Sequence, residues 1–203
     1  PGRGVNPIRR ENLRRLSRAY WSVVILGACF SLARFSEAFL LLRADQGGLA
    51  VSWIPLVLVV MNLAYSLSAY PVGRLADRMN HTTLLAIGLL VLLVADLLLA
   101  TSNHWAMVLL GVAVWGLHLG MTQGLLATMI AHTAPADLRG TAFGAFNMVS
   151  GLALLIASVL AGLLWDQLGA AATFLAGAGF SCAALLCLLW LKKIGDNPGT
   201  RGV

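Results

Sequence analysis

Long apolar runs, separated by short polar segments, dominate the sequence. No charged residue occurs from Gly47 to Gly73, and Asp166 is the only charged residue from Gly140 to Leu191. An apolar run of about 20 residues crosses the roughly 30 Å hydrocarbon layer of a bilayer when it forms a helix. These runs are too long and too apolar for the core of a soluble protein, so they indicate a chain embedded in a membrane.

The pattern predicts an all-α integral membrane protein with six transmembrane helices. Inside lipid every backbone N–H and C=O must be paired within the chain, which leaves helices or a closed barrel. The runs are rich in Leu and Ala and do not alternate with a period of two, so helices are favoured. We expect a linker at 1–17, a six-helix domain at 18–193 and a tail at 194–203. The expected spans are 18–43, 50–70, 82–101, 105–131, 140–164 and 170–191.

Composition and charge agree with a membrane location. Hydrophobic residues make up 59% of the chain and charged residues 11%, whereas a soluble domain is nearer about a quarter charged. The net charge of +6 would indicate nucleic acid as the partner of a soluble protein. Here the distribution of charge favours the lipid bilayer as partner, and we expect no binding of nucleic acid.

Basic residues fall almost entirely on one side of a six-span chain. Arg43 lies on the opposite side, and Arg34 lies within the first span. Basic residues collect on the cytoplasmic side of bacterial membranes, so we expect both termini in the cytoplasm and a multi-pass protein of the inner (plasma) membrane. The residues on the basic side are Arg3, Arg9, Arg10, Arg14, Arg15, Arg18, Arg74, Arg78, Arg139, Lys192, Lys193 and Arg201.

Signals for enzyme chemistry are absent from the sequence. The chain contains no G-x-S-x-G, H-E-x-x-H or C-x-x-C pattern and no phosphate-binding loop of the G-x-x-x-x-G-K type. Cys29, Cys182 and Cys187 lie inside apolar spans, so we expect packing residues and not disulfides or metal ligands. We therefore predict no catalytic residue, no cofactor and no metal. Because the chain starts at Pro1 without a signal-peptide pattern, we expect a fragment or the second half of a longer protein.

Two polar segments resemble loop signatures of the major facilitator superfamily (MFS) of transporters. The segment Gly73-Arg74-Leu75-Ala76-Asp77-Arg78 resembles the G-x-L-a-D-r core found between the second and third helices of that family and, more weakly, between the eighth and ninth. The segment from Ala134 to Gly144 resembles P-x-x-x-R-G-x-a-x-g, common between helices ten and eleven. The signature positions are Gly73, Arg74, Leu75, Asp77, Arg78, Arg139 and Gly140.

The resemblance covers nearly the whole chain and implies an MFS half-domain, corresponding to helices seven to twelve. It implies an N-terminal six-helix half as the missing partner. In the first signature we expect Gly73 to allow a tight turn after Pro71 and Asp77 to accept hydrogen bonds from the adjoining helix N-terminus. Arg74 and Arg78 would pair with carboxylates or lipid phosphate. From spacing alone a solvated basic loop is equally acceptable, and the resemblance favours an interdomain latch.

Two ionisable residues lie inside the first span. Such residues are costly in a membrane and usually face a cavity or a partner. Arg34 and Glu37 are three residues apart, so on a continuous helix they share one face. They form either an internal ion pair or a substrate or proton site. The corresponding helix lines the central cavity in the family that the chain resembles, which favours the second interpretation.

Further polar residues lie near the middle of other spans. His118 and Asn62 are predicted at similar depth, where secondary transporters bind substrate, and Gln123 and Asn147 lie somewhat nearer the cytoplasm. A helix–helix hydrogen bond is an equally good role for His118. Asp96 lies close to the outer end of its span, and we expect it to reach the interface or to pair locally.

Small residues predict close helix packing in the fourth span. Gly116, Gly120 and Gly124 are spaced four residues apart and lie on one face, where they permit close approach of another helix. His118 is two residues from both Gly116 and Gly120, so its side chain points away from that face. It could then face a cavity while the glycines pack.

These observations favour a secondary active transporter, an MFS permease half that moves a small organic solute or drug by alternating access. We expect efflux, coupled to protons through Glu37 or His118. A self-contained six-helix channel subunit or membrane scaffold is the alternative. An intramembrane enzyme using His118 or His132 is a more distant one, because no paired nucleophile or second ligand stands at helical spacing.

Overall fold

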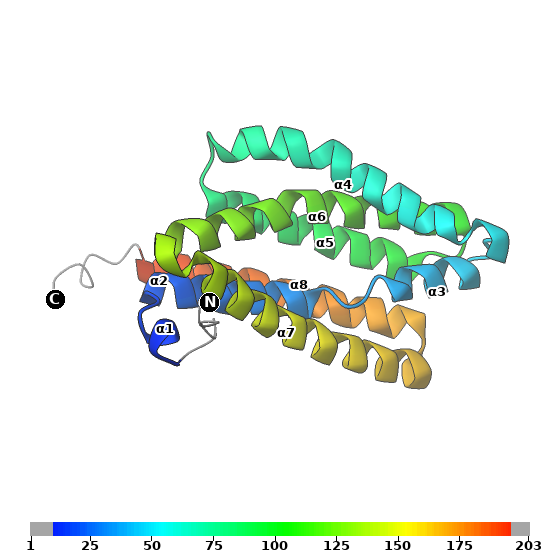
Figure 1. Ribbon diagram of the computed structural model, residues 1–203. Helices are drawn as coiled ribbons and strands as arrows, with labels where there is room; N and C mark the ends of the chain where they lie inside the picture. The colour runs from blue at the N-terminus through cyan, green and yellow to red at the C-terminus, as the bar shows by residue number, and fades with distance from the viewer. Residues whose placement is uncertain (1–9, 196–203) are drawn as a thin grey trace, which may run out of the picture.

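The computed structural model describes residues 10–195, and within this range the fold is all-helical (Figure 1). Much of the expected linker and tail, residues 1–9 and 196–203, lies outside the described residues. Six helical segments are long and apolar enough to cross a membrane, which confirms the predicted all-α fold with six spans. The elements are α1 (Arg10–Arg14), α2 (Arg18–Ala33), α3 (Ala38–Gln46), η1 (Val51–Trp53), α4 (Pro55–Ala76), α5 (His81–Thr101), α6 (Trp105–Thr133), η2 (Ala136–Leu138), α7 (Arg139–Leu168) and α8 (Ala170–Gly195).

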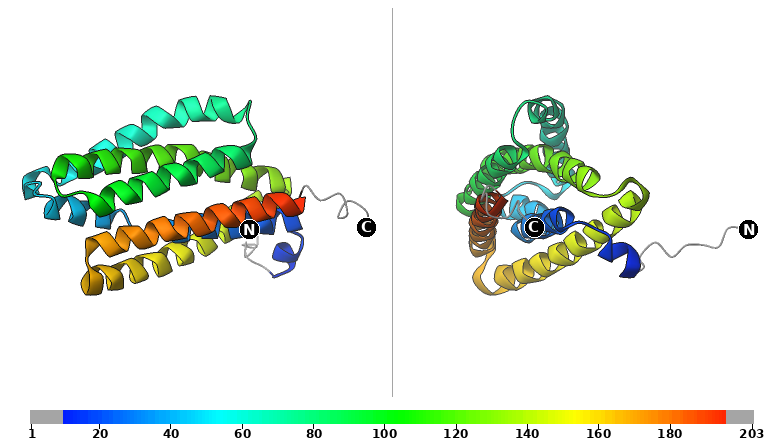
Figure 2. Two further views of the ribbon diagram at one scale, coloured as in Figure 1. Left: turned by 180° about the vertical axis from the view of Figure 1, so that it is seen from behind. Right: turned by 90° about the vertical axis from the view of Figure 1, so that its left-hand side faces the viewer.

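The helices form a bundle with α4 at one edge and α7 at the opposite edge (Figures 1 and 2). Helix α6 packs between α4 and α5, and α8 packs against both α5 and α2. Helix α2 in turn packs against α7. The first part of the first span therefore lies inside the bundle, where it contacts three other spans.

Apolar side chains from α2, α5, α6 and α8 form the main core. Trp115 of α6 is fully buried, and its ring centroid lies 5.4 Å from that of Phe35. The Phe35 ring also lies 5.4 Å from Phe174 of α8. Such tilted contacts between aromatic rings add to the stabilisation from burial itself. Phe35 thus joins the segment between α2 and α3 to the interior of the bundle.

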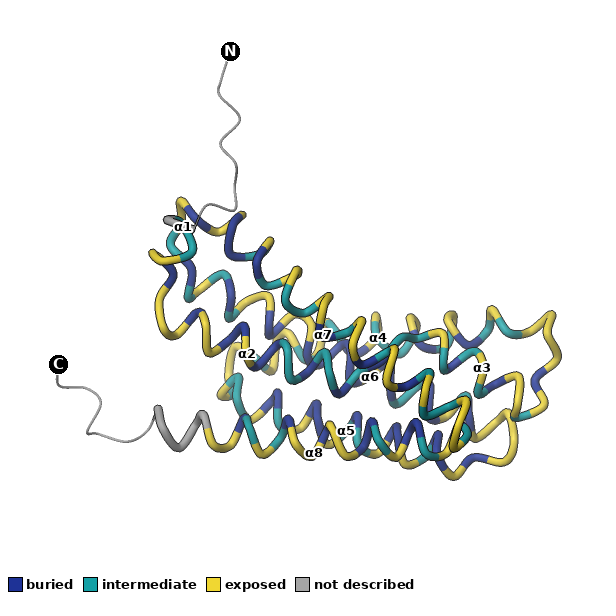
Figure 3. Tube along the Cα trace, turned by 90° about the horizontal axis from the view of Figure 1, so that it is seen from below, coloured by how far each residue is buried: buried dark blue, intermediate teal, exposed yellow. Residues whose placement is uncertain are grey.

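The edge helices α4 and α7 are packed on few sides. In the most apolar stretch of each, 17% of residues are buried, compared with 56% for α6. Exposed positions recur along all the spans, as expected for surfaces that face lipid (Figure 3). The larger exposure of α4 and α7 means that each presents more apolar surface than one lipid-facing stripe requires.

The predicted end of the second span is wrong. Helix α4 continues through Pro71 and Gly73 to Ala76, so neither residue ends the span or forms a turn. Pro71 has no backbone N–H, so the carbonyl oxygen of Leu67, four residues earlier, loses its helical donor and the helix loses one hydrogen bond. In a bilayer an interrupted helix would leave more backbone groups unpaired than this single loss, which favours continuation.

Most of the basic residues at helix ends lie at one end of the bundle. Basic residues lie at the start of α2, the end of α4 and the start of α7, and these helix ends all lie at the same end of the bundle (Figure 1). There Arg15 forms an ion pair with Asp137, with 2.7 Å between Nη2 and Oδ2. Ser17 caps α2 by accepting from the Tyr20 N–H and donates to the Thr133 carbonyl. These bonds tie the start of α2 to the α6–α7 connection.

Candidate functional site

The first span is broken at mid-length, although it contains neither proline nor glycine there. Helix α2 ends at Ala33, and Arg34 has an extended backbone with φ −118° and ψ 102°. The Ser36 amide donates to Oγ of Ser158 on α7 at 3.1 Å, and that hydroxyl donates to the Leu154 carbonyl. A polar side chain from a neighbouring helix thus replaces a lost helical hydrogen bond, which is how broken helices persist at membrane depth.

The break overturns the expected geometry of Arg34 and Glu37. Because residues 34–37 lie between α2 and α3, the two side chains do not share a helix face. Within the described residues the only ion pair closer than 4.0 Å joins Arg15 to Asp137. Arg34 and Glu37 therefore do not form the internal ion pair that the spacing allowed.

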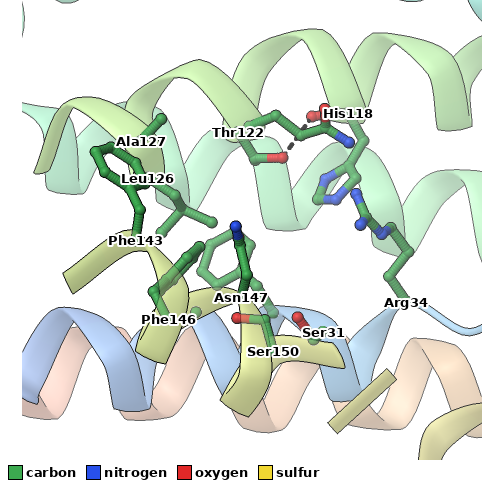
Figure 4. A pocket seen from close by; sticks show the side chains of 13 residues that line it. Ser31, Arg34, His118, Thr122, Leu126, Ala127, Phe143, Phe146, Asn147 and Ser150 are labelled. Carbon is green, nitrogen blue, oxygen red and sulfur yellow. Dashed lines mark hydrogen bonds between the residues drawn. The ribbon is translucent and has the colours of Figure 1, made fainter. Parts of the chain in front are cut away.

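A cavity of about 280 Å³ lies beside the break, between α2, α6 and α7 (Figure 4). Its volume is near the lower end of the range of about 300–1,000 Å³ typical of ligand sites. Polar and aromatic side chains alternate around it, and Arg34 is its one formally charged lining residue. The lining residues are Gly27, Phe30, Ser31, Arg34, His118, Thr122, Gln123, Leu126, Ala127, Phe143, Phe146, Asn147 and Ser150.

His118 is held in one tautomer at the wall of this cavity. The residue is 1% exposed, and its Nδ1 lies 2.7 Å from the carbonyl oxygen of Gly88 on α5. A carbonyl oxygen can only accept, so Nδ1 carries the proton and Nε2 keeps a free lone pair. The guanidinium of Arg34 points toward the imidazole (Figure 4). His118 therefore combines the predicted helix–helix hydrogen bond with a position on the cavity wall.

The close approach of α5 and α6 brings the His118 side chain within reach of the α5 backbone. A methyl group added at Gly88 would lie 2.5 Å from Cγ2 of Thr122, which is closer than real side chains come. Thr122 also donates from Oγ1 to the His118 carbonyl at 2.9 Å. Glycine at position 88 thus lets the α6 backbone come near enough for the imidazole to reach the α5 carbonyl.

The cavity unites four of the six polar residues singled out from the sequence. Arg34, His118, Gln123 and Asn147 line it together. Glu37 does not line it. Asn62 lies on the exposed side of α4, donates to the Leu58 carbonyl at 2.8 Å and borders a separate shallow groove. Similar depth in the membrane does not bring Asn62 and His118 together, because α4 turns this face away from the cavity.

Sequence reasoning missed the aromatic and hydroxyl part of the cavity. Phe30 stacks on His118, with ring centroids 6.4 Å apart and planes at 17°. The missed lining residues nevertheless repeat every three or four positions, which is the signal of one helix face. Together with the predicted His118, Gln123 and Asn147 they form three stripes: Gly27, Phe30 and Ser31 on α2, His118, Thr122, Gln123, Leu126 and Ala127 on α6, and Phe143, Phe146, Asn147 and Ser150 on α7.

The glycine face of α6 packs against α4 over two of its three positions. A side chain at Gly116 would collide with the Met61 carbonyl, and one at Gly120 with the Ser68 hydroxyl. Nothing lies within 4 Å of the corresponding position at Gly124. The predicted close packing is therefore confirmed for Gly116 and Gly120 and does not extend to Gly124.

Asp96 does not reach the membrane interface. The residue is fully buried, and neither carboxylate oxygen has a hydrogen-bond partner in the part of the chain that the structure describes. A methyl group at Gly177 of α8 would lie 3.0 Å from its Oδ2. The expectation of snorkelling or local pairing is wrong, because Asp96 faces the α5–α8 contact, where Gly177 leaves room for it.

The signature residues lie on helix ends and not in an extended loop. Gly73, Arg74 and Leu75 form the last turn of α4, Asp77 follows directly, and Arg139 and Gly140 begin α7. Asn80, and not Asp77, caps α5 by accepting from the Thr82 N–H at 2.9 Å. Arg74, Leu75 and Arg78 border a shallow surface depression beside Pro71. The basic side chains are thus displayed on a helix end.

Sequence comparisons point to one family. The family model described as Major Facilitator Superfamily matches residues 19–201. An MFS-type transporter of Methanocaldococcus jannaschii is 29% identical over 188 residues, covering 90% of this chain and 47% of that protein. The purine ribonucleoside efflux pump NepI of Escherichia coli O127:H6 is 28% identical, over 97% of this chain and 48% of the pump.

Comparison with solved structures agrees on the fold. The POT family transporter PepTSo superimposes with a TM-score of 0.68 at 18% identity, covering 87% of this chain and 37% of that transporter. The chain spans about half the length of the curated relatives that it matches. With the family match running over nearly all of its helices, the chain belongs to the major facilitator superfamily.

Proposed function

We propose that this chain is the C-terminal half of a secondary transporter that moves a small organic solute by alternating access. The broken first span beside the cavity carries the proposal. Broken helices with polar groups at mid-membrane are the usual construction of substrate sites in secondary transporters. The convergence of Arg34, His118, Gln123 and Asn147 on one small cavity supports a binding role for it.

The partner that we propose is a six-helix N-terminal half. Helices α4 and α7 present more apolar surface than a lipid-facing stripe needs, and they lie at opposite edges of the bundle (Figure 2). A second bundle packed along both edges would cover this surface and close the open side of the cavity. The shape of the bundle therefore favours a transporter made of two six-helix halves over a self-contained channel subunit or scaffold.

We further propose that the basic end of the bundle is cytoplasmic and that the membrane is the inner (plasma) membrane. Basic helix ends remain on the cytoplasmic side of bacterial membranes because translocating them is unfavourable. Arg74, Arg78 and Arg139 would lie on that face as a latch between the halves or as contacts to anionic lipid.

Export is the direction that we propose, with protons as the coupling ion. The similarity to a purine ribonucleoside efflux pump supports export of small organic molecules. Glu37 and His118 are the groups beside the break and the cavity that could exchange a proton.

The test is reconstitution of the chain with and without an upstream six-helix half. Inosine and benzoate, as radiolabelled probes, would be followed into proteoliposomes with and without a pH gradient. We expect saturable flux of a probe only when both halves are present, and a dependence of that flux on the gradient. Saturable flux through the chain alone would contradict the two-half proposal and favour a self-contained channel. Inactivity of both halves together toward a broad set of organic solutes would contradict the transport proposal.

A further inference from the structure

Arg34 gives the cavity lining a positive charge that no carboxylate in the lining balances. Among the described residues no carboxylate lies within 4.0 Å of its guanidinium. Glu37, the nearest acidic residue along the chain, is not part of the lining, although its charge interacts with that of Arg34 from outside it. A charge inside a membrane-spanning bundle is costly unless it is paired or faces water. A counter-charge in direct contact with Arg34 inside the cavity would therefore come from whatever the cavity binds.

The remaining lining residues indicate which other chemical groups the ligand should contain. Phe30, Phe143 and Phe146 contribute aromatic rings, while Asn147 and Ser150 contribute hydrogen-bonding groups in a part of the lining away from Arg34 (Figure 4). The planar guanidinium pairs with a carboxylate through two parallel hydrogen bonds. Aromatic rings favour a flat apolar body beside it. A cavity of about 280 Å³ admits a small molecule of this kind.

His118 adds a proton acceptor beside the same charge. Since its Nδ1 proton is used by the Gly88 carbonyl, a second proton can bind only at Nε2. Within the cavity lining, Arg34 is the one formally charged neighbour of the ring. The segment after α2 supplies Arg34, α7 supplies only the neutral Asn147 and Ser150 to the cavity, and Asp96 of α5 faces Gly177 instead.

Without a ligand, a proton on Nε2 would place a second cation beside Arg34, and like charges disfavour each other. An anion bound between the two residues removes this repulsion and attracts both. Binding of the anion and of the proton must then favour each other by the same factor, because coupling between two sites is reciprocal.

We propose that the cavity binds a small aromatic carboxylate through Arg34 and that one proton from the aqueous phase adds to Nε2 of His118 when it binds. The step forms one N–H bond from the Nε2 lone pair and breaks the bond between that proton and the hydronium ion or buffer acid that donates it, whose electron pair stays on the donor. The inference rests on the proposed transport function and specifies the substrate class of the same site. Solute and proton would cross together, so export would follow an outward gradient of the solute.

Calorimetry on the chain assembled with its proposed N-terminal half tests the proposal. The probes are benzoate, its neutral isostere benzamide and the cation benzylamine, each titrated at neutral pH in phosphate and in Tris. We expect benzoate to bind about tenfold more tightly than benzamide, the equivalent of about 1.4 kcal/mol, with benzylamine weakest. The two buffers differ in ionisation enthalpy, so the difference in heat reports the proton taken up with benzoate.

Variants separate the two parts of the proposal. We expect Arg34→Gln to abolish the preference for benzoate over benzamide. An asparagine at position 118 still offers an N–H to the Gly88 carbonyl but has no group equivalent to Nε2. His118→Asn should therefore bind benzoate without proton uptake. His132→Asn, on the exposed side of the same helix, is the matched control and should behave as the parent protein.

A gain-of-function variant covers the case in which position 34 or 118 tolerates no change. Asn147→Asp adds a carboxylate to the cavity and should shift the preference from benzoate toward benzylamine. Equal affinity for benzoate and benzamide in the parent protein would overturn the anion site. Proton uptake that persists in His118→Asn would overturn the proton site. If benzoate binds as expected but no solute is transported, the transport function fails and the anion site stands.

Discussion

Helix α6 offers a controlled test of how tightly it packs on α4. Gly116 and Gly124 lie on the same face of one helix, two turns apart, yet only Gly116 is in contact with the neighbouring backbone. Replacing each by alanine makes the same chemical change in the same helix. The pair therefore separates the effect of helix contact from the effect of helix propensity.

The expected magnitudes follow from the two environments. At Gly124 a new methyl group meets nothing within 4 Å, so Gly124→Ala should gain only the helix preference of alanine, about 0.5–1 kcal/mol. At Gly116 the methyl group would collide with the Met61 carbonyl, which cannot move aside without separating the helices. Overpacking of this kind costs about 1–3 kcal/mol. We expect Gly116→Ala to be less stable than Gly124→Ala by this amount.

The free energy of unfolding would be measured for the protein in mixed micelles by titration with sodium dodecyl sulfate. Loss of helical circular dichroism and the fluorescence of the tryptophans would be followed together. A difference of about 1–3 kcal/mol corresponds to roughly 5- to 150-fold in the unfolding equilibrium. Equal stability of the two alanine variants would refute the close contact between α4 and α6 at Gly116.

The remaining predictions concern the break, the buried carboxyl group and the orientation. Ser158→Ala should lower the free energy of unfolding by about 1–3 kcal/mol, because it leaves the Ser36 amide without its partner; Ser158→Thr keeps the hydroxyl and should not. Asp96→Val should raise it by about 1–3 kcal/mol, since it removes an unpaired buried carboxyl group, and a loss of stability would reveal a partner for it. In intact cells an impermeant maleimide should label Ala50→Cys and leave Ala136→Cys unlabelled, and labelling of both from outside would refute the topology.

The sequence by itself determined the number and class of the spans. Length and hydropathy suffice for this, because a bilayer requires each span to be a helix of about 20 apolar residues. The loop signatures Gly73 to Arg78 and Ala134 to Gly144 identified the family, and the comparisons agree. The position of His118 on the face opposite Gly116 and Gly120 also followed from helical spacing alone.

Only the tertiary structure decided where the first span breaks and which polar residues meet. The break depends on Ser158, which is 122 residues away from Ser36 in the sequence, and no local signal such as proline or glycine marks it. Glycine at positions 88 and 177 lets neighbouring helices approach, which directs His118 to a carbonyl and encloses Asp96. Periodicity shows which residues share a face of one helix. Packing between segments that are distant in the sequence sets where along its length, and in which direction, that face meets another helix. For this reason Glu37 and Asn62 lie outside the cavity that Arg34 and His118 share.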